Sequence, residues 1–376
     1  MNKFSFDKII LTPFDVDLSY SPIKKQLNAE TYVLGAFNPG MTRLPDGNLL
    51  LMVRIAEALK NPVKSGKIYT IRWDEKKGYV PDEYELNEVD ASDPRKFLLK
   101  EFLPNTVYAL TSLSWLLPVE LSDDGSNIIN IHYDKIIAPQ KGYQEYGIED
   151  PRISYINGKY YMTTCSVSSE RHSTTLYKSD NGINYHLEGI ILDHQNKDML
   201  LFEGTINDKF YALTRPLGSS YFATPPDSIF NPGPSINLAQ SPDLLHWKPL
   251  DEPFIRPGKK SGQLLRLGGG AQPILTPEGW LVLFHGVEKK GDVGIYRTYW
   301  AILDKNNPQK ILHLEMEKPL LEANPDLTNE LRDIIYLEDV VFTTGIVEAK
   351  DKFIISSGEL DLCARITHIP KLCFAF

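Results

Sequence analysis

Two features of the sequence predict an all-β fold, a five-bladed β-propeller: a phrase that recurs five times and the near absence of long helical periodicity. A polar turn followed by an apolar strand recurs five times, with the strands at residues 49–54, 160–165, 210–215, 280–285 and 353–358. Turns such as Asp46-Gly47 and Asn157-Gly158 tolerate the positive φ that tight hairpins require. Long helical periodicity is nearly absent, so we expect strands to dominate. Five repeats suggest five blades whose strand ends converge on a central site.

The spacing of the repeats indicates where the blades carry insertions. The later repeats lie about 50, 71 and 72 residues apart, close to one four-stranded blade with its loops. The first gap is about 111 residues, so we expect an insertion within about 55–145. Residues 217–234 are rich in Pro, Gly and Ser and predict a long surface loop. Short helices are expected only at 93–101 and 324–331. Since no linker separates two domains, residues 1–376 are expected to form one.

Composition excludes several classes of function. The net charge of −9 and the isoelectric point near 5.5 disfavour nucleic-acid binding, which needs a basic face. The first residues lack an apolar signal core and no run reaches the length of a membrane span, so a cytoplasmic protein without membrane partners is expected. Cys165, Cys363 and Cys373 show neither zinc spacing nor the pattern of a disulfide framework. No metal or organic cofactor is expected.

The strongest candidate for chemistry is Glu149-Asp150-Pro151-Arg152, which leads into a strand. On an extended backbone Glu149 and Asp150 point to opposite sides, so one can enter a central cavity while the other holds the scaffold. Arg152 shares a side with Asp150 and could orient a carboxylate. For these four residues alone, a surface turn with a salt bridge is an equally good interpretation.

An ordered set of phrases resembles glycoside hydrolase family 130, the β-mannoside phosphorylases and their hydrolytic relatives. The matching phrases span roughly residues 35–365 and include 37–40, 149–152, 201–203, 213–216, 241–247, 267–270, 279–287, 301–304 and 340–345. The family fold is a five-bladed propeller, in agreement with the repeats. The resemblance implies an inverting phosphorylase that transfers a mannosyl unit to phosphate, with phosphate as co-substrate.

The resemblance also implies roles for single residues. Asp150 matches the catalytic acid, which is thought to pass its proton through a sugar hydroxyl. The residues implied to hold the sugar are Asn38, Arg54 and Asp361, with Arg152 beside them. The implied phosphate-binding set is Lys197, Arg215, Arg266, His285 and Tyr296. Several cationic or hydroxyl donors suit a phosphate dianion. Taken singly, each is more simply a rim charge or a scaffold group; together they favour one anionic ligand.

Departures from the family pattern leave alternatives open. This chain has Phe202-Glu203-Gly204 where family phosphorylases carry Phe-Pro-Glu or Phe-Pro-Arg, and Pro39 where some carry serine. A carboxylate at Glu203 would repel phosphate, but it could activate water as a general base opposite Asp150. The alternative is therefore an inverting β-1,2-mannosidase. A third interpretation is a noncatalytic carbohydrate-binding propeller. Linkage, acceptor sugar and homo-oligomer formation stay open.

Overall fold

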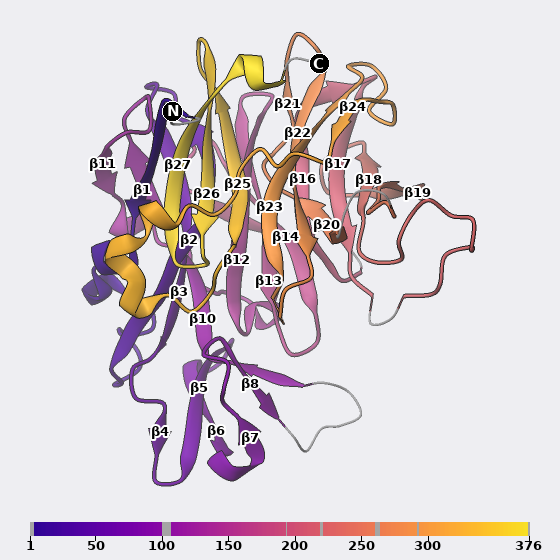
Figure 1. Cartoon of the computed structure of the whole chain (residues 1–376). Coiled ribbons are helices and arrows are strands. Elements are labelled where there is room, and N and C mark those ends of the chain that lie inside the picture. The colour runs from indigo at the N-terminus through magenta and orange to yellow at the C-terminus, as the bar shows by residue number, and fades with distance from the viewer. Residues whose placement is uncertain are drawn as a thin grey trace.

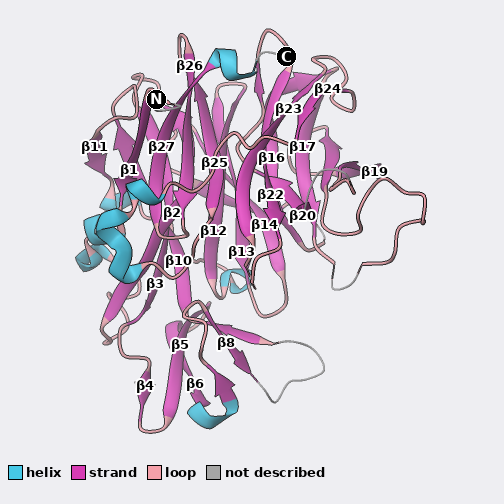
Figure 2. Ribbon diagram, in the orientation of Figure 1, coloured by secondary structure: helices cyan, strands magenta, loops and turns pink. Residues whose placement is uncertain are grey.

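The computed structural model describes residues 4–99, 107–192, 194–218, 221–259, 264–291 and 293–374. The protein is all-β, as expected, and Figure 2 shows only short helices among the strands. None of the helices in these ranges is long and apolar enough to cross a membrane. The helices are single 3-10 turns or slightly longer, at Pro13–Asp15, Leu18–Tyr20, Leu86–Glu88, Tyr133–Lys135, Gly142–Gln144, Pro325–Leu327, Asn329–Ile334 and Lys371–Phe374.

Five four-stranded antiparallel units follow one another along the chain (Figure 1). The first unit contains β2 (Thr31–Arg43), β3 (Leu49–Leu59), β10 (Ser112–Leu121) and β11 (Ile128–Ile131). The second contains β12 (Gly147–Ile156), β13 (Lys159–Val167), β14 (His172–Ser179) and β15 (His186–Ile190). The third contains β16 (Asn196–Ile206), β17 (Lys209–Pro216), β18 (Ile236–Ser241) and β19 (Lys248–Ile255).

The last two units complete the fold. The fourth contains β20 (Leu264–Gly269), β22 (Trp280–Glu288), β23 (Ile295–Leu303) and β24 (Ile311–Glu315), with β21 (Ile274–Leu275) paired to β22. The fifth contains β25 (Val341–Glu348), β26 (Lys352–Glu359), β27 (Cys363–Pro370) and, from the other end of the chain, β1 (Phe6–Leu11). A single parallel pair, Ser114 with Gly147, joins the first two units into one sheet.

The repeated phrase of the sequence is the second strand of every unit: β3, β13, β17, β22 and β26. The turns before these strands adopt the left-handed backbone that their residue types predict. Gly47 has φ of 96°, Asn157 has φ of 50° and Asn207 has φ of 50°. The prediction of five equivalent strands is therefore confirmed.

Apolar clusters fill the spaces between successive units. Alternate residues of one strand serve two neighbours: Val282 and Phe284 of β22 pack toward the third unit, whereas Leu281 and Leu283 pack toward the fifth. Similar clusters join the first unit to the second, the second to the third, and the fifth back to the first. Each sheet is thus buried on both faces, which explains the continuous apolar runs in the sequence.

A buried ion-pair network ties β1 to the fifth unit. Arg365 is 1% exposed and its Nε and Nη2 lie 2.7 and 2.8 Å from the two carboxylate oxygens of Asp7 on β1. Its Nη1 lies 2.9 Å from Glu359 Oε2. Bidentate pairing of this kind fixes geometry as well as charge. The two ends of the chain are therefore joined through one guanidinium.

The long insertion predicted in the first unit runs from residue 60 to residue 111, narrower than expected because β10 and β11 belong to the unit itself. It forms two small sheets that project from one end of β3 and β10 (Figure 1), and we call it the insertion lobe. Its strands are β4 (Val63–Lys64), β5 (Lys67–Asp74), β6 (Gly78–Glu85), β7 (Val89–Asp90), β8 (Lys96–Leu99) and β9 (Tyr108–Leu110).

The two expected helices have different outcomes. The helix at 93–101 is wrong, because residues 96–99 form β8 and pair with β9; residues 100 and 101 lie outside the described ranges. Phe97 and Leu99 alternate toward the small core of the lobe, which is a strand pattern. The second expectation, at 324–331, coincides with two 3-10 helices. Residues 217–218 and 221–235 form no regular helix or strand, in agreement with the expected loop.

Candidate active site

One small polar cavity gathers most of the residues named from the sequence. Its volume is about 170 Å³. Strands of all five units, three connecting segments and the insertion lobe contribute to it. Its lining is Asn38, Arg54, Arg95, Glu149, Asp150, Lys197, Asp198, Arg215, Val293, Tyr296, Val340, Phe342 and Asp361. Four cations and four carboxylates face one another here, which makes it a site for a polar and charged ligand.

A repeated backbone distortion presents these side chains. The first strands of three units, β2, β12 and β16, each have a register shift at the cavity. Asn38, Asp150 and Asp198 sit at these shifts with φ of 47°, 50° and 55°. Asn and Asp tolerate the left-handed region better than other residues with a Cβ, and bulges often redirect side chains at functional sites. The paired phrases Asn38-Pro39 and Asp150-Pro151 were the sequence signal for this device.

Asp150 is a buried carboxylate held by two donors. Asn38 Nδ2 donates to its Oδ1 over 2.8 Å, and Arg54 Nη1 lies 3.0 Å from the same oxygen. Burial by itself would raise the pKa of Asp150, but the charges of Arg54, Arg152 and Lys197 lower it well below its usual value. Asp150 is therefore ionised near neutral pH.

Arg54 brings Glu149 into the same cavity. Its Nη2 lies 2.7 Å from Glu149 Oε1, its Nε donates to Ser114 Oγ over 3.0 Å, and its guanidinium lies 4.7 Å from the ring centre of Phe37. The expectation that Glu149 and Asp150 point to opposite sides is wrong. The reason is the positive φ of Asp150, which breaks the alternation of an extended strand.

Arg152 lies behind the cavity and does not line it. Its Nη1 donates to the carbonyl of Asp150 over 2.8 Å, and its Nη2 lies 3.0 Å from Asp198 Oδ1. Two further bonds reach the carbonyls of Gly269 and Gly270. Through these bonds Arg152 holds the bulges of β12 and β16 in place. The expectation that it binds substrate is not supported by this position.

The predicted phosphate set divides into two layers. Lys197, Arg215 and Tyr296 line the cavity, whereas Arg266 and His285 lie behind them. Arg266 Nη2 donates to Tyr296 Oη over 2.6 Å, which leaves the phenolic proton of Tyr296 free to donate. Lys197 Nζ is 3.8 Å from Glu149 Oε2.

His285 supports Arg215. Its Nε2 lies 3.3 Å from Arg215 Nη1, and Asp198 Oδ2 lies 3.1 Å from Arg215 Nε. Burial lowers the pKa of His285 to about 3, so the imidazole is neutral and can accept a hydrogen bond from the guanidinium. Asp198 and His285 thus aim Arg215 into the cavity. The role of Asp198 was missed from the sequence, where it follows Lys197 without any distinguishing motif.

Asp361 lies in the turn between β26 and β27 and has φ of 51°. Burial raises its pKa to about 6, although the charge of Arg54 opposes this shift. The hydroxyl of Tyr336 donates to its backbone carbonyl over 2.7 Å. Gly358 of β26 faces Asn38, and any side chain there would collide with Asn38 Oδ1. The first and fifth units are therefore brought together at the cavity.

Glu203 does not meet Asp150. It lines a different cavity of about 490 Å³ with Tyr155, Tyr160 and Gln272. Both Asp198 and Glu203 belong to β16, and Asp198 lines the polar cavity. Glu203 lies five residues further along the strand, a distance of roughly 16 Å. The backbone N–H of Tyr155 donates to Glu203 Oε1 over 3.0 Å, and burial raises the pKa of Glu203 to about 7. The pairing of Glu203 with Asp150 is not supported.

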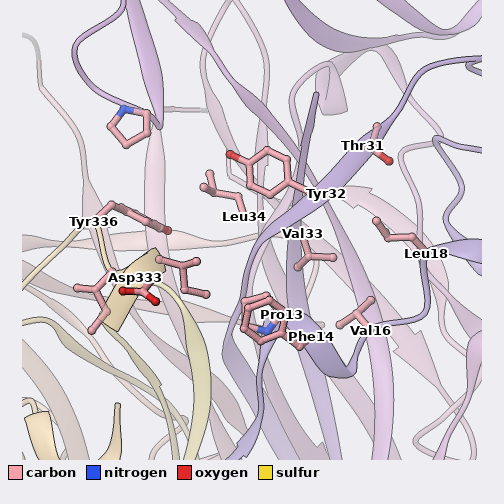
Figure 3. Close-up of a pocket in the computed structure, with 13 residues that line it drawn as sticks. Pro13, Phe14, Val16, Leu18, Thr31, Tyr32, Val33, Leu34, Asp333 and Tyr336 are labelled. Atoms are coloured by element: carbon pink, nitrogen blue, oxygen red, sulfur yellow. The ribbon is translucent and has the colours of Figure 1, made fainter. Parts of the chain in front are cut away.

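Figure 3 shows a larger groove, of about 580 Å³, between residues 13–18, residues 31–34 and residues 333–336. Apolar side chains such as Val16, Leu18 and Leu34 form most of its wall. It contains none of the residues predicted to carry chemistry. Among the residues that the structure describes, no group of three or more His, Cys, Asp or Glu could hold a metal ion. The chemistry-bearing residues are those of the small polar cavity.

Comparisons with known proteins identify the family of the chain. A family model described as beta-1,4-mannooligosaccharide phosphorylase, of glycoside hydrolase family 130, matches residues 108–373. The chain is 31% identical to a β-1,2-mannobiose phosphorylase of Listeria innocua over 96% of this chain and 94% of that one. It is also 31% identical to a 1,2-β-oligomannan phosphorylase of Thermoanaerobacter over 64% of this chain and 74% of that one.

Solved structures give the same result. β-1,2-mannobiose phosphorylase from Listeria innocua, in complex with β-1,2-mannobiose, superposes with a TM-score of 0.78 at 30% identity over 98% of this chain and 97% of that one. A structure reported with family-130 hydrolases that target β-1,2-mannosidic linkages in Candida mannan has a TM-score of 0.66 at 16% identity, over 98% and 95% of the two chains, and shows the fold alone. The chain belongs to glycoside hydrolase family 130.

Proposed function

We propose that this protein is an inverting β-mannoside phosphorylase that transfers a mannosyl unit from a mannobiose-like oligosaccharide to phosphate. The observation that carries the proposal is the convergence of Lys197, Arg215 and Tyr296 beside Asp150 in one cavity. Two cations and a hydroxyl suit a phosphate dianion. The relatives named β-1,2-mannobiose phosphorylase support a β-1,2-linked substrate.

The geometry suggests a division of labour within the cavity. Asn38, Arg54 and Asp361 surround Asp150 and bind the mannosyl unit, while Arg215 and Lys197 aim a phosphate oxygen at its anomeric carbon. Asp150 supplies a proton toward the leaving oxygen. Bound phosphate adds negative charge that offsets the cations now holding the pKa of Asp150 low. Binding of the nucleophile therefore raises the pKa of Asp150 and favours its protonated form.

We also infer that the five units are the blades of a five-bladed propeller. The first strands lie against one another, with β2 against β12 and β25, β12 against β16, and β16 against β20. The apolar clusters follow the same cyclic order, and β1 completes the last unit. This arrangement brings the ends of first strands to one central site. An experimental structure in which the fifth and first units do not pack together would contradict it.

The hydrolase remains the alternative within the family. It requires Glu203 as the general base opposite Asp150, but Glu203 lines a separate cavity. A noncatalytic carbohydrate-binding protein is less compatible with four cations beside a buried carboxylate. A cytoplasmic location stays a prediction, as does the absence of any cofactor besides the co-substrate phosphate.

The test is incubation of the purified protein with β-1,2-mannobiose, with and without phosphate. We expect one mannose and one α-mannose 1-phosphate per substrate, only when phosphate is present, since inversion of a β-mannoside yields the α anomer. Phosphorus and proton NMR identify both products. Two free mannoses in phosphate-free buffer would establish the hydrolase instead. No turnover of β-1,2- or β-1,4-mannobiose under either condition would favour the noncatalytic alternative.

A further inference from the structure

One cavity-lining residue comes from the insertion lobe and not from the five units. Arg95 lies between β7 and β8, and its side chain is 27% exposed. Asp93 holds its guanidinium, with Nε 3.0 Å from Oδ1 and Nη2 2.7 Å from Oδ2. The backbone is fixed as well, because Thr111 N–H donates to the Arg95 carbonyl over 3.1 Å and Thr111 Oγ to the Pro94 carbonyl over 2.6 Å. The lobe therefore presents a prepositioned cation to the cavity.

The guanidinium of Arg95 keeps donors available for a ligand. A guanidinium has five N–H donors, and Asp93 engages Nε and one position of Nη2. Within the described ranges, no hydrogen bond joins Arg95 Nη1 to a protein acceptor. These N–H groups can donate to the hydroxyl oxygens of a sugar.

Arg95 and the phosphate cations have different partners. Arg95 pairs with Asp93 of the insertion lobe at 2.7 Å, and the charge of Asp361, to which we assign the mannosyl unit, also raises the pKa of Arg95. Arg215 and Lys197 are associated instead with Asp198 and Glu149. In an inverting displacement the nucleophile and the leaving group occupy opposite faces of the reacting sugar. Arg95 comes from the lobe and pairs with none of the carboxylates beside the phosphate cations, so its donors are available to the leaving group.

We propose that Arg95 binds the acceptor sugar, the mannose or manno-oligosaccharide that leaves in phosphorolysis and attacks in synthesis. The insertion lobe then sets acceptor specificity, while the strand ends of the five units bind the transferred mannosyl group and phosphate. This inference rests on the proposed phosphorylase function.

The synthetic direction separates the two sugars, because mannose 1-phosphate and free acceptor are added independently. For Arg95→Ala we expect the KM for mannose as acceptor to rise about 10- to 100-fold, the range for losing hydrogen bonds to a charged group. The KM for mannose 1-phosphate should be unchanged. Asp93→Asn removes the negative charge that holds the guanidinium but keeps Arg95. It should therefore raise the KM for the acceptor less than Arg95→Ala does. It also provides the same readout should Arg95→Ala not fold.

Arg72→Ala is the matched control. Arg72 lies in the same lobe, is 26% exposed and pairs through Nε with Asp82, but it does not line the cavity. It should leave both KM values unchanged. The proposal is refuted if the wild-type enzyme is active and folded Arg95→Ala has an unchanged KM for the acceptor. It is also refuted if Arg95→Ala raises only the KM for mannose 1-phosphate. A wild-type protein that makes no disaccharide from mannose 1-phosphate would instead refute the proposed function and this inference together.

Discussion

Replacement of Glu203 by glutamine should make the stability of the protein less dependent on pH. Burial raises the pKa of Glu203 from 4.5 to about 7, so the folded protein retains a proton that the unfolded chain releases. Protonated Glu203 therefore contributes its full stabilisation to the folded wild type below pH 4.5. This stabilisation is lost progressively as the pH rises to about 7. Glutamine resembles the protonated carboxyl group and cannot ionise.

The size of the effect follows from the pKa difference. A shift of about 2.5 pH units at about 1.4 kcal/mol per unit gives an upper limit of about 3.5 kcal/mol. Glu203 retains partial exposure, so solvent screening reduces this figure. The stability of Glu203→Gln relative to wild type should thus increase by up to about 3 kcal/mol between about pH 5 and about pH 8.

Urea unfolding of both proteins at the two pH values measures this difference, provided that unfolding is reversible. Other titrating groups are common to both proteins and cancel in the comparison. A stability difference that does not change with pH would refute the assignment of a buried, protonated carboxyl to Glu203. Phosphate-dependent activity should be retained in the variant, and its collapse would show that Glu203 acts in the chemistry despite its separate cavity.

Three further predictions concern the active site and the closure of the fold. Asp150→Asn should lower kcat on β-1,2-mannobiose by about 10²- to 10⁴-fold, since it removes the proton donor; near-normal turnover by a folded variant would exclude this role. Arg215→Ala should raise the KM for phosphate by about 10- to 100-fold, the loss of one charge-assisted contact; steady-state kinetics with each substrate varied would contradict this if only the KM for the disaccharide changed. Arg365→Ala should destabilise the protein by about 3–5 kcal/mol, because it leaves Asp7 and Glu359 without their buried partner; a loss below about 1 kcal/mol in urea unfolding would place the pair among weak surface contacts.

Local sequence patterns were enough to predict the all-β character and the five equivalent second strands. Both depend on short-range physics. Turn residues such as Gly47 and Asn157 adopt positive φ locally, and the strands that follow are apolar on both faces. The choice of Asp150 as the catalytic acid depended instead on the resemblance of an ordered set of phrases to the family, because Glu149-Asp150-Pro151-Arg152 alone fits a surface turn equally well.

Which side chains share the cavity depends on tertiary contacts that the local sequence does not reveal. A single positive φ at Asp150 turns Glu149 inward, where alternation along an ideal strand would have sent it away. Arg152 and His285 resemble ligand-binding groups in the sequence, but in the structure they lie behind the residues that line the cavity. The spacing of the repeats predicts an insertion in the first unit, but it does not predict that Arg95 of this insertion lines the cavity. These outcomes depend on packing between segments far apart in the chain, and local sequence patterns contain no information on such distances.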